Sequence, residues 1–389
     1  MRAAVVGAGE WGTAFSSLLA ARGHDVTLAC RDPEQARAID ETGHNPRYLP
    51  SADLSGVSAT TVDDPSLAGV DLHVVAVPSQ AFGEVVRALP GAAPVLSLTK
   101  GLDPESGGRL SELVERRGAA VLSGPTFAEE IADGLPAAAV IASSDPGLAL
   151  ELQEAVNSLT FRVYVNEDLV GVELCAAAKN VMALAAGGVD GLGLGDNAKA
   201  ALIARGLPTA AVIASEDGFL AGQLQHAVNS AVFRAYVNPD IVGVELCAAA
   251  KNVIALAAGA VDGLDLGDNA KASLVTRGLV EMARLGEAAG ARPETFSGLA
   301  GMGDLIVTCW SRHGRNRQAG ELIARGSSPE EAADRIGTVE GLTTAPVLRD
   351  LSRRLGIELP ITEGVCQVLD GEDLHDLAAN LMGRQPTRE

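Results

Sequence analysis

Two lysines occupy the same position in two nearly identical stretches of the chain. Lys179 and Lys251 each lie in the string VGVELCAAAKNV, which is otherwise mainly apolar and predicts a helix. An ammonium group on such a helix is expected to face a cleft or a partner, because an unpaired buried charge is costly. Desolvation and neighbouring cations lower the pKa of a lysine and suit it to proton transfer near neutral pH. The alternative is a lysine whose stem lies along the helix surface with its charge in water.

The two lysines belong to a tandem repeat. Residues 135–206 and 207–278 align without a gap, and 54 of the 72 positions are identical. A unit of this length that occurs only twice does not predict a solenoid. We interpret it as a duplicated part of one domain, so the chain has two candidates for one catalytic lysine.

A glycine-rich turn near the N-terminus is the second chemical signal. The residues Gly7-Ala8-Gly9-Glu10-Trp11-Gly12 follow an apolar strand and open a helix. In a dinucleotide-binding turn the first glycine makes the turn, the second admits the pyrophosphate and the third lets helix and strand pack closely. This context predicts a dinucleotide site, with a glycine-rich turn that binds nothing as the alternative.

Arg31 follows the next predicted strand, where an acidic residue often binds the ribose 2′-hydroxyl of the cofactor. An arginine there favours a 2′-phosphate and therefore NADP. Asp32 is the next residue and keeps NAD open. A solvated loop charge is the alternative for Arg31.

Further polar residues follow strands or lie in the C-terminal part of the chain. Lys100 and the stretch 123–126 follow predicted strands, at the edge where ligands bind in parallel sheets. Downstream, Asp304 and Thr308 precede Arg315-Asn316-Arg317, and the arginine fork suits phosphate binding. A surface lysine and a solvated basic face are the alternatives. The six histidines show no ligand spacing, so no metal site is predicted.

The elements that must position these residues change in kind along the chain. Short apolar runs alternate with helical patterns in the first part, which predicts an α/β Rossmann domain with a doubly wound parallel sheet. We expect strands at 2–6, 25–30, 71–77, 94–98, 119–122, 137–142 and 161–165, and helices at 12–21, 33–39, 107–116, 148–156 and 170–186. After residue 278 the patterns are helical and predict an all-α domain, with helices at 279–289, 318–325, 329–336, 345–355 and 362–369.

The junctions of the repeat predict different roles for its copies. The last helix of copy two continues into LVEMARLGEAAG, whereas that of copy one meets Leu207-Pro208, and proline stops a helix. We therefore expect copy one to complete the sheet and copy two to begin the helical domain. The expected domains are a dinucleotide-binding domain at 1–166, a duplicated insertion at 167–238 and a helical substrate domain at 239–389.

Composition restricts the partners. The net charge of −20 over 389 residues argues against nucleic acid and anionic membranes, although a local basic cluster allows an anionic small substrate. Five cysteines without close spacing predict reduced thiols and a cytoplasmic location. Neither a signal peptide nor a membrane-inserted segment is expected. A homodimer is compatible with this interpretation.

With these residues in place, the chain resembles the NAD(P)-dependent glycerol-3-phosphate dehydrogenases of the bacterial type. The matching motifs run in order: GAGEWGTA, HNPRYLP, VPS, TKG, SGPTFAEE, VGVELCAAAKNV, DGLGLGDNAK, GLAGMGDLIVTC, GRNR and VEGLTT. The family pattern contains the middle segment once, so this chain departs from it by one inserted copy. The resemblance implies a Rossmann domain, a helical domain, and reversible reduction of dihydroxyacetone phosphate to sn-glycerol 3-phosphate for phospholipid synthesis.

The resemblance also implies roles for single residues. The proton-transferring lysine matches Lys251 or Lys179, and Asp304 matches the aspartate that orients it. The matched substrate contacts are Lys100, Gly124, Thr126, Thr308, Gly314, Arg315 and Asn316. The matched cofactor contacts are Gly7, Gly9, Glu10, Trp11, Gly12, Arg31, Tyr48, Lys100, Ala128, Arg315, Thr338 and Glu340, with Glu10 in place of a frequent serine.

Two other functions stay open at this point. A related two-domain reductase would use the same basic cluster to bind the carboxylate of a hydroxy acid, or would act on a hydroxyacyl thioester. A catalytically impaired, NADPH-binding homologue would result if the duplication had spoiled the cleft between the domains.

Overall fold

The computed structural model describes residues 1–114, 117–205, 210–230 and 233–374. Its internal contacts divide the chain into two compact units. Among the described residues, the first comprises Met1–Val181 with Asp268–Ala270, and the second comprises Met182–Gly267 with residues 271–374. The division falls inside helix α6 (Leu169–Gly191). Leu207 and Pro208, where the sequence predicts the end of a helix, lie outside the described residues.

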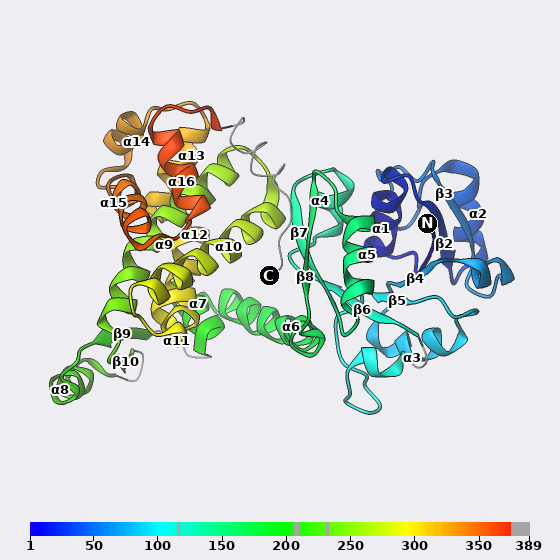
Figure 1. Cartoon of the computed structure of the whole chain (residues 1–389), viewed down its shortest axis with the longest axis horizontal. Helices are drawn as coiled ribbons and strands as arrows, with labels where there is room; N and C mark the ends of the chain where they lie inside the picture. Colours follow the sequence, from blue (N-terminus) through cyan, green and yellow to red (C-terminus); the bar gives the residue numbers. More distant parts are fainter. Residues whose placement is uncertain (115–116, 206–209, 231–232, 375–389) are drawn as a thin grey trace. The chain divides into compact units, whose positions relative to one another are not determined.

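The first unit is built on an eight-stranded sheet of order β3-β2-β1-β4-β5-β6-β7-β8 (Figure 1). The strands are β1 (Arg2–Val6), β2 (Asp25–Cys30), β3 (Val57–Thr61), β4 (Leu72–Val75), β5 (Val95–Ser97), β6 (Ala119–Ser123), β7 (Ala137–Ser143) and β8 (Phe161–Asn166). Central strands such as β4 and β5 are buried at every residue, as continuous apolar runs predict. The Rossmann-type fold expected from the sequence is confirmed.

One part of the sheet differs from the expected parallel arrangement. Strand β7 runs antiparallel to β6, whereas β8 is parallel to β7. Only the five-residue helix α4 (Ala128–Ala132) lies between β6 and β7. An antiparallel neighbour needs no long crossover over the sheet face, so this short connection is sufficient.

Helices cover the sheet. They are α1 (Glu10–Ala21), α2 (Pro33–Thr42), α3 (Ser79–Ala88), α4 and α5 (Pro146–Val156), together with the 3-10 helices η1 (Pro65–Gly69) and η2 (Leu110–Leu113). Helices α1 and α5 are in contact on one face of the sheet (Figure 1).

Two local expectations need correction. The helix expected at 107–116 is wrong, because the described part of this segment contains only η2. Gly107 has φ +69 and is followed by a second glycine, and glycines lose the most backbone entropy in a helix. Strand β3 was not expected, since its sequence VSATT is polar and its position is at the sheet edge.

The second unit is mainly helical, as expected. Its helices are α7 (Asp196–Arg205), α8 (Gly218–Val228), α9 (Ile241–Gly263), α10 (Gly267–Ala288, of which the first turn belongs to the first unit), α11 (Pro293–Ser297), α12 (Asp304–Trp310), α13 (Arg315–Ala324), α14 (Pro329–Ile336), α15 (Glu340–Leu355) and α16 (Pro360–Leu369), with a π-helical turn at Leu299–Gly303. Helix α9 is central and packs against α12, α13, α15 and α16. Its Val253, Ala255 and Ala258 are fully buried in the apolar core.

The two copies of the repeat have the same local structure. Strands β9 (Ala210–Ala214) and β10 (Arg234–Asn238) form a separate two-stranded parallel sheet. They pair Ala210 with Arg234, and β7 and β8 pair Ala138 with Arg162, the same register displaced by the repeat length of 72. Copy one thus supplies the last two strands of the large sheet, and copy two supplies the central helix of the second unit.

Helices α6 and α9 are also long and apolar enough to cross a membrane by length and composition. Half of the apolar window of α9 is buried inside the second unit, as in the core helix of a globular domain. The corresponding window of α6 is 17% buried.

Candidate active site

The glycine-rich turn has the geometry of a nucleotide-binding turn. Gly7 has φ +112, a conformation that favours glycine. A Cβ on Gly12 would lie 1.9 Å from the Gly7 carbonyl oxygen, so only glycine allows α1 to approach the turn this closely. A Cβ on Gly9 would meet nothing within 4 Å, which leaves open space over the N-terminus of α1. These three environments match the three roles expected for the glycines, and they suit a bound pyrophosphate.

The residues after β2 are those expected to bind the ribose of the cofactor, and their contacts differ. Asp32 caps the N-terminus of α2, accepting a hydrogen bond from the Glu34 amide at 2.9 Å, and forms an ion pair with Arg47. The hydrogen bond from Glu34, followed by the contact with Arg47, holds the pKa of Asp32 below its usual value. Arg31 is exposed beside it. Asp32 and Arg47 are therefore engaged with each other, whereas the exposed Arg31 has no ion pair among the described residues and is available to an anion.

The other expected cofactor contacts of the first unit lie in α1, in the loop after α2 and at the start of α4. Trp11 packs edge-on against Phe15, and its buried Nε1 has no hydrogen-bond partner among the described residues. Glu10 begins α1 and is exposed, Tyr48 is 42% exposed, and Ala128 is buried at the start of α4.

Lys100 lies beyond the end of β5 in a partly buried setting. Its Nζ donates to Thr126 Oγ1 at 3.2 Å and to the Gly124 carbonyl at 3.4 Å, so three of the expected substrate contacts lie together. Burial, and then the positive charge of Lys179, lowers the pKa of Lys100 to about 8. Gly124 has φ +152, and a Cβ there would lie 2.7 Å from the Ala138 carbonyl oxygen. This corner of the first unit holds a lysine next to a threonine hydroxyl, and the lysine is the group that can attract an anionic substrate.

Lys251 lies in the second unit and forms an ion pair with Asp304, at the start of α12. Thr308, one turn later, donates to the Asp304 backbone carbonyl at 2.6 Å. The lysine side chain is 20% exposed, so its ammonium is held by the carboxylate and still reaches solvent. The expected pairing of the lysine with this aspartate is present in the geometry.

A chain of amides continues from the lysine. Asn252 donates to Glu340 at 2.7 Å and accepts from Asn316 at 3.0 Å, and Asn316 in turn accepts from the Gly341 amide at 2.8 Å. Asn252 was not singled out from the sequence, although it follows the lysine in both copies. Asn316 is 8% exposed, and both ends of its amide already have partners.

The basic cluster at the start of α13 divides into two kinds of residue. Arg315 is exposed next to Gly314, whose missing Cβ allows a close approach to the Thr308 carbonyl. Arg317 instead forms ion pairs with Asp262 and Glu321 and is largely buried. Arg317 is therefore a structural residue. Of the two arginines in the cluster, only Arg315 stays a candidate for binding a phosphate. Thr338 is exposed just before α15, two residues from Glu340.

The counterpart of Lys251 has a different environment. Lys179 is exposed on α6, and its Nζ donates to Asn180 Oδ1 at 3.0 Å. It influences Lys100 electrostatically but has no contact like that of Lys251 with Asp304. The two candidate lysines are thus distinguished by their partners, although their local sequences are the same.

Comparison with known proteins identifies the family. The N-terminal domain of NAD-dependent glycerol-3-phosphate dehydrogenase matches residues 2–149, and the C-terminal domain matches residues 168–229 and again 240–379. The chain belongs to the NAD-dependent glycerol-3-phosphate dehydrogenase family. The two C-terminal matches begin 72 residues apart, which is the length of the repeat.

Individual members of the family are similar over the whole chain. Glycerol-3-phosphate dehydrogenase [NAD(P)+] of Moorella thermoacetica is 39% identical over 396 aligned positions, which cover 99% of this chain and 97% of the relative. The enzyme of the same name from Halorhodospira halophila is 37% identical, with 99% and 98% covered. A solved glycerol-3-phosphate dehydrogenase from Coxiella burnetii is 32% identical and covers 98% of this chain and 99% of that chain, with a TM-score of 0.40.

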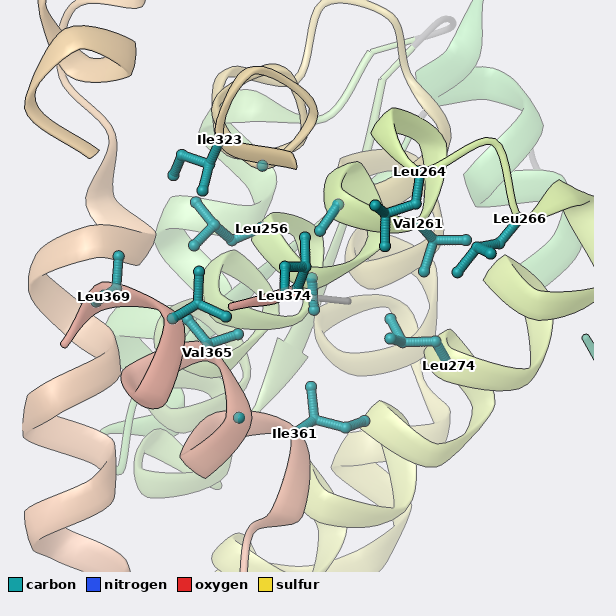
Figure 2. Close-up of a pocket in the computed structure, with 15 residues that line it drawn as sticks. Leu256, Val261, Leu264, Leu266, Leu274, Ile323, Ile361, Val365, Leu369 and Leu374 are labelled. Atoms are coloured by element: carbon teal, nitrogen blue, oxygen red, sulfur yellow. The ribbon is translucent and has the colours of Figure 1, made fainter. Parts of the chain in front are cut away.

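This member of the glycerol-3-phosphate dehydrogenase family also has an apolar pocket of about 120 Å³ in its second unit (Figure 2). Leu256, Val261, Leu274, Val365 and Leu369 point into it from α9, α10 and α16. The lining offers no charged group to a phosphate. The pocket is therefore distinct from the residues around Lys251 and is not assigned to the substrate.

Proposed function

We propose that this chain catalyses the reversible, NAD(P)H-dependent reduction of dihydroxyacetone phosphate to sn-glycerol 3-phosphate, which supplies phospholipid synthesis. The ion pair between Lys251 and Asp304 carries the proposal, because it holds a cationic proton donor in a family of dehydrogenases. The residues Lys100, Gly124 and Thr126 of the first unit are proposed as further substrate contacts.

Lys251 has two tasks in this reaction. When bound, the nicotinamide would supply the hydride to C2 of the substrate. Negative charge then develops on the carbonyl oxygen, where the Lys251 ammonium stabilises it and transfers a proton. Asp304 fixes the direction of the ammonium through the ion pair, and Thr308 donates a hydrogen bond to the carboxylate.

Arg315 is proposed to bind the substrate phosphate, since its guanidinium is exposed and matches two phosphate oxygens. Gly314 allows this end of α13 to lie close to Thr308. The role of Asn316 is to hold Asn252, and through it Glu340, beside the lysine. Fixing the phosphate and the carbonyl together supplies the positional part of catalysis.

We also propose that NADP is preferred over NAD. Asp32 is engaged by the N-terminus of α2 and by Arg47, so it is poorly available to the ribose 2′-hydroxyl. Arg31, which is exposed, would instead bind a 2′-phosphate. Gly7, Gly9 and Gly12 would hold the pyrophosphate, with Glu10, Trp11, Tyr48, Ala128, Thr338 and Glu340 as further cofactor contacts.

The proposed organisation assigns residues 1–166 to the dinucleotide domain, 239–389 to the substrate domain and 167–238 to an insertion. The place of β8 in the large sheet and of α9 in the second core supports this division. The five unpaired cysteines favour a cytoplasmic location. A homodimer is proposed as the assembly, because it would cover exposed apolar residues such as Val181 and Leu184.

The decisive experiment compares NADPH oxidation by the purified chain with dihydroxyacetone phosphate, an oxo acid and an oxoacyl thioester. We expect turnover with dihydroxyacetone phosphate alone, and a lower KM for NADPH than for NADH. Turnover of the oxo acid or the thioester instead would identify a related reductase. Tight NADPH binding by the folded chain without turnover would identify an impaired homologue.

A further inference from the structure

The repeat provides two candidates for one place in the large sheet. We call α5, β7 and β8 the first edge module, and α8, β9 and β10 the second edge module. The second module has the same elements, displaced by 72 residues, and the same strand register. The first is the end of an eight-stranded sheet, whereas the second is a separate strand pair with one helix, which contacts the turn Leu299–Gly303 and α9 but pairs with no further strand among the described residues.

The residues that pair with β6 in the first module are identical in the second. Strand β6 pairs with residues 140–143 of β7, and Ser143 donates to the Ala119 carbonyl at 2.7 Å. The corresponding residues 212–215 of the second module are the same four, Val-Ile-Ala-Ser. Every backbone and side-chain contact that β7 makes with β6 is therefore available to the second module.

Apolar side chains of the second module are more exposed than the identical side chains of the first. Leu152 and Val156 of α5 are 2% and 0% exposed, whereas their counterparts Leu224 and Val228 of α8 are 44% and 45% exposed. A two-stranded sheet is marginally stable by itself in water. The second module therefore gains burial if it replaces the first, while the first loses a similar amount.

A glutamate also has partners in the first copy and is exposed in the second. Glu173, early in α6, accepts hydrogen bonds from the Ser111 amide at 2.9 Å and from Arg109 at 3.1 Å. Its counterpart Glu245, early in α9, is exposed. If the second module occupied the edge of the sheet, β10 would lead into α9 and bring Glu245 to Arg109 and Ser111.

We propose that the two edge modules exchange at β6 within one chain. In the exchanged form β9 and β10 complete the sheet and α9 follows them directly, so the helix that carries Lys251 is joined to the dinucleotide domain without an insertion. Residues 135–206 then form the excursion. They leave the chain after Gly134, a turn with φ +74 between α4 and β7, where an insertion interrupts no helix or strand.

The substitutions between the copies set the direction of the equilibrium. Val163 is fully buried in the sheet, and Ala235 replaces it in the second module. Pro146 begins α5, where proline is favoured, and Gly218 begins α8. The lost methyl groups and the weaker helix start favour the first module by a factor on the order of ten to a hundred.

A competition between two disulfides tests the exchange. Val121 of β6 lies opposite Ala142 of β7 in the antiparallel register, and Ala214 is the counterpart of Ala142. The variant Val121→Cys/Ala142→Cys/Ala214→Cys, with Cys175→Ser to remove the exposed thiol, is equilibrated in a glutathione redox buffer. Opposed residues in such a pair lie within disulfide range. Mass spectrometry of the tryptic peptides then gives the ratio of the two disulfides, and size-exclusion chromatography separates monomers.

We expect both disulfides in the monomer, with the Val121–Ala142 product in at least about tenfold excess. The reciprocal change Val163→Ala/Ala235→Val should shift the ratio toward Val121–Ala214 by about tenfold or more. Val121→Cys with Gly222→Cys, an exposed position on α8, measures chance collisions. A Val121–Ala214 yield no greater than this control, or one found only between chains, would overturn the proposal. The test does not depend on the proposed enzyme activity.

Discussion

Helices α6 and α9 have almost the same sequence and different surroundings. They differ at three of 23 positions and begin and end at equivalent residues. Val181 and Leu184 of α6 are 68% and 80% exposed, whereas their counterparts Val253 and Leu256 of α9 are 0% and 5% exposed. The local sequence therefore determines that a helix forms and where it ends. The rest of the second unit determines which copy is a core helix and acquires the Asp304 partner for its lysine.

Burial in the edge modules is reversed. In these modules copy one is buried and copy two is exposed, as Val156 and Val228 illustrate. Each copy is thus well packed over one half of its length, copy one in its strands and copy two in its long helix. The same chemical groups therefore contribute differently to stability and function, and matched substitutions in the two copies measure that difference.

The largest expected difference is between the two lysines. Lys251→Ala should lower kcat for dihydroxyacetone phosphate by about 10³-fold, because it removes the proton donor that Asp304 orients. Lys179→Ala should change kcat by less than about threefold, since Lys179 is exposed and bonded only to its neighbour Asn180 among the contacts described. Steady-state kinetics at saturating NADPH measures both values.

Asp304→Asn tests whether the carboxylate that faces Lys251 supports its role. It keeps the size of the side chain but removes the charge that faces Lys251, so kcat should fall both in the unmodified chain and in the Lys179→Ala background. Equal losses of kcat in Lys179→Ala and Lys251→Ala would contradict the assignment of Lys251 as the sole proton donor.

The next difference is in stability. Leu256→Ala should lower the free energy of unfolding of the second unit by about 3 kcal/mol, because it opens a cavity beside the pocket of Figure 2. Leu184→Ala removes the same atoms from an exposed site and should change it by less than about 0.5 kcal/mol. Urea denaturation followed by circular dichroism compares the two. Similar losses would mean that α6 is buried to the same extent as α9.

Much of this arrangement was predictable from local sequence. The glycine turn was predictable because the local backbone geometry requires each of its glycines. The lysine–aspartate pair was implied by the family motifs. The antiparallel β7 and the short η2 were not predictable, since strand direction and marginal helices depend on contacts distant in sequence. The structural role of Arg317 depends on Asp262, 55 residues away, and therefore has no local signal. For the same reason the motif around each lysine could not show which copy meets Asp304.

A smaller difference is expected at the start of the long helices. Glu173→Ala should cost the first unit about 2 kcal/mol, because it leaves Arg109 and the Ser111 amide without their carboxylate in a partly buried site. Glu245→Ala should be neutral within about 0.5 kcal/mol, since this glutamate is exposed. Thermal unfolding of the two variants at equal ionic strength makes the comparison. A destabilising Glu245→Ala would show that copy two also uses the contact with Arg109 and Ser111.

The smallest difference concerns the charge of Lys179 rather than its chemistry. Burial, and to a smaller extent Lys179, lowers the pKa of Lys100 to about 8. Lys179→Gln should therefore raise the pKa of Lys100, though not to its ordinary value of 10.5, because burial remains. Competitive acetylation at a series of pH values, read by mass spectrometry of the Lys100 peptide, gives this pKa. Lys251→Gln is the matched control, and an equal shift in both variants would contradict the assignment.

The same shift has a consequence for stability. Between about pH 8 and 10.5 the unfolded chain binds a proton at Lys100 that the folded chain has released, so the folded state gains stability as the pH rises through this window. Lys179→Gln should narrow the window from its lower end and so reduce the total gain in stability between pH 7.5 and 10, whereas Lys251→Gln should leave the Lys100 contribution unchanged. Urea midpoints measured across this pH range test the sign and the size of the gain. An undiminished gain in Lys179→Gln would show that Lys179 does not repel the charge on Lys100.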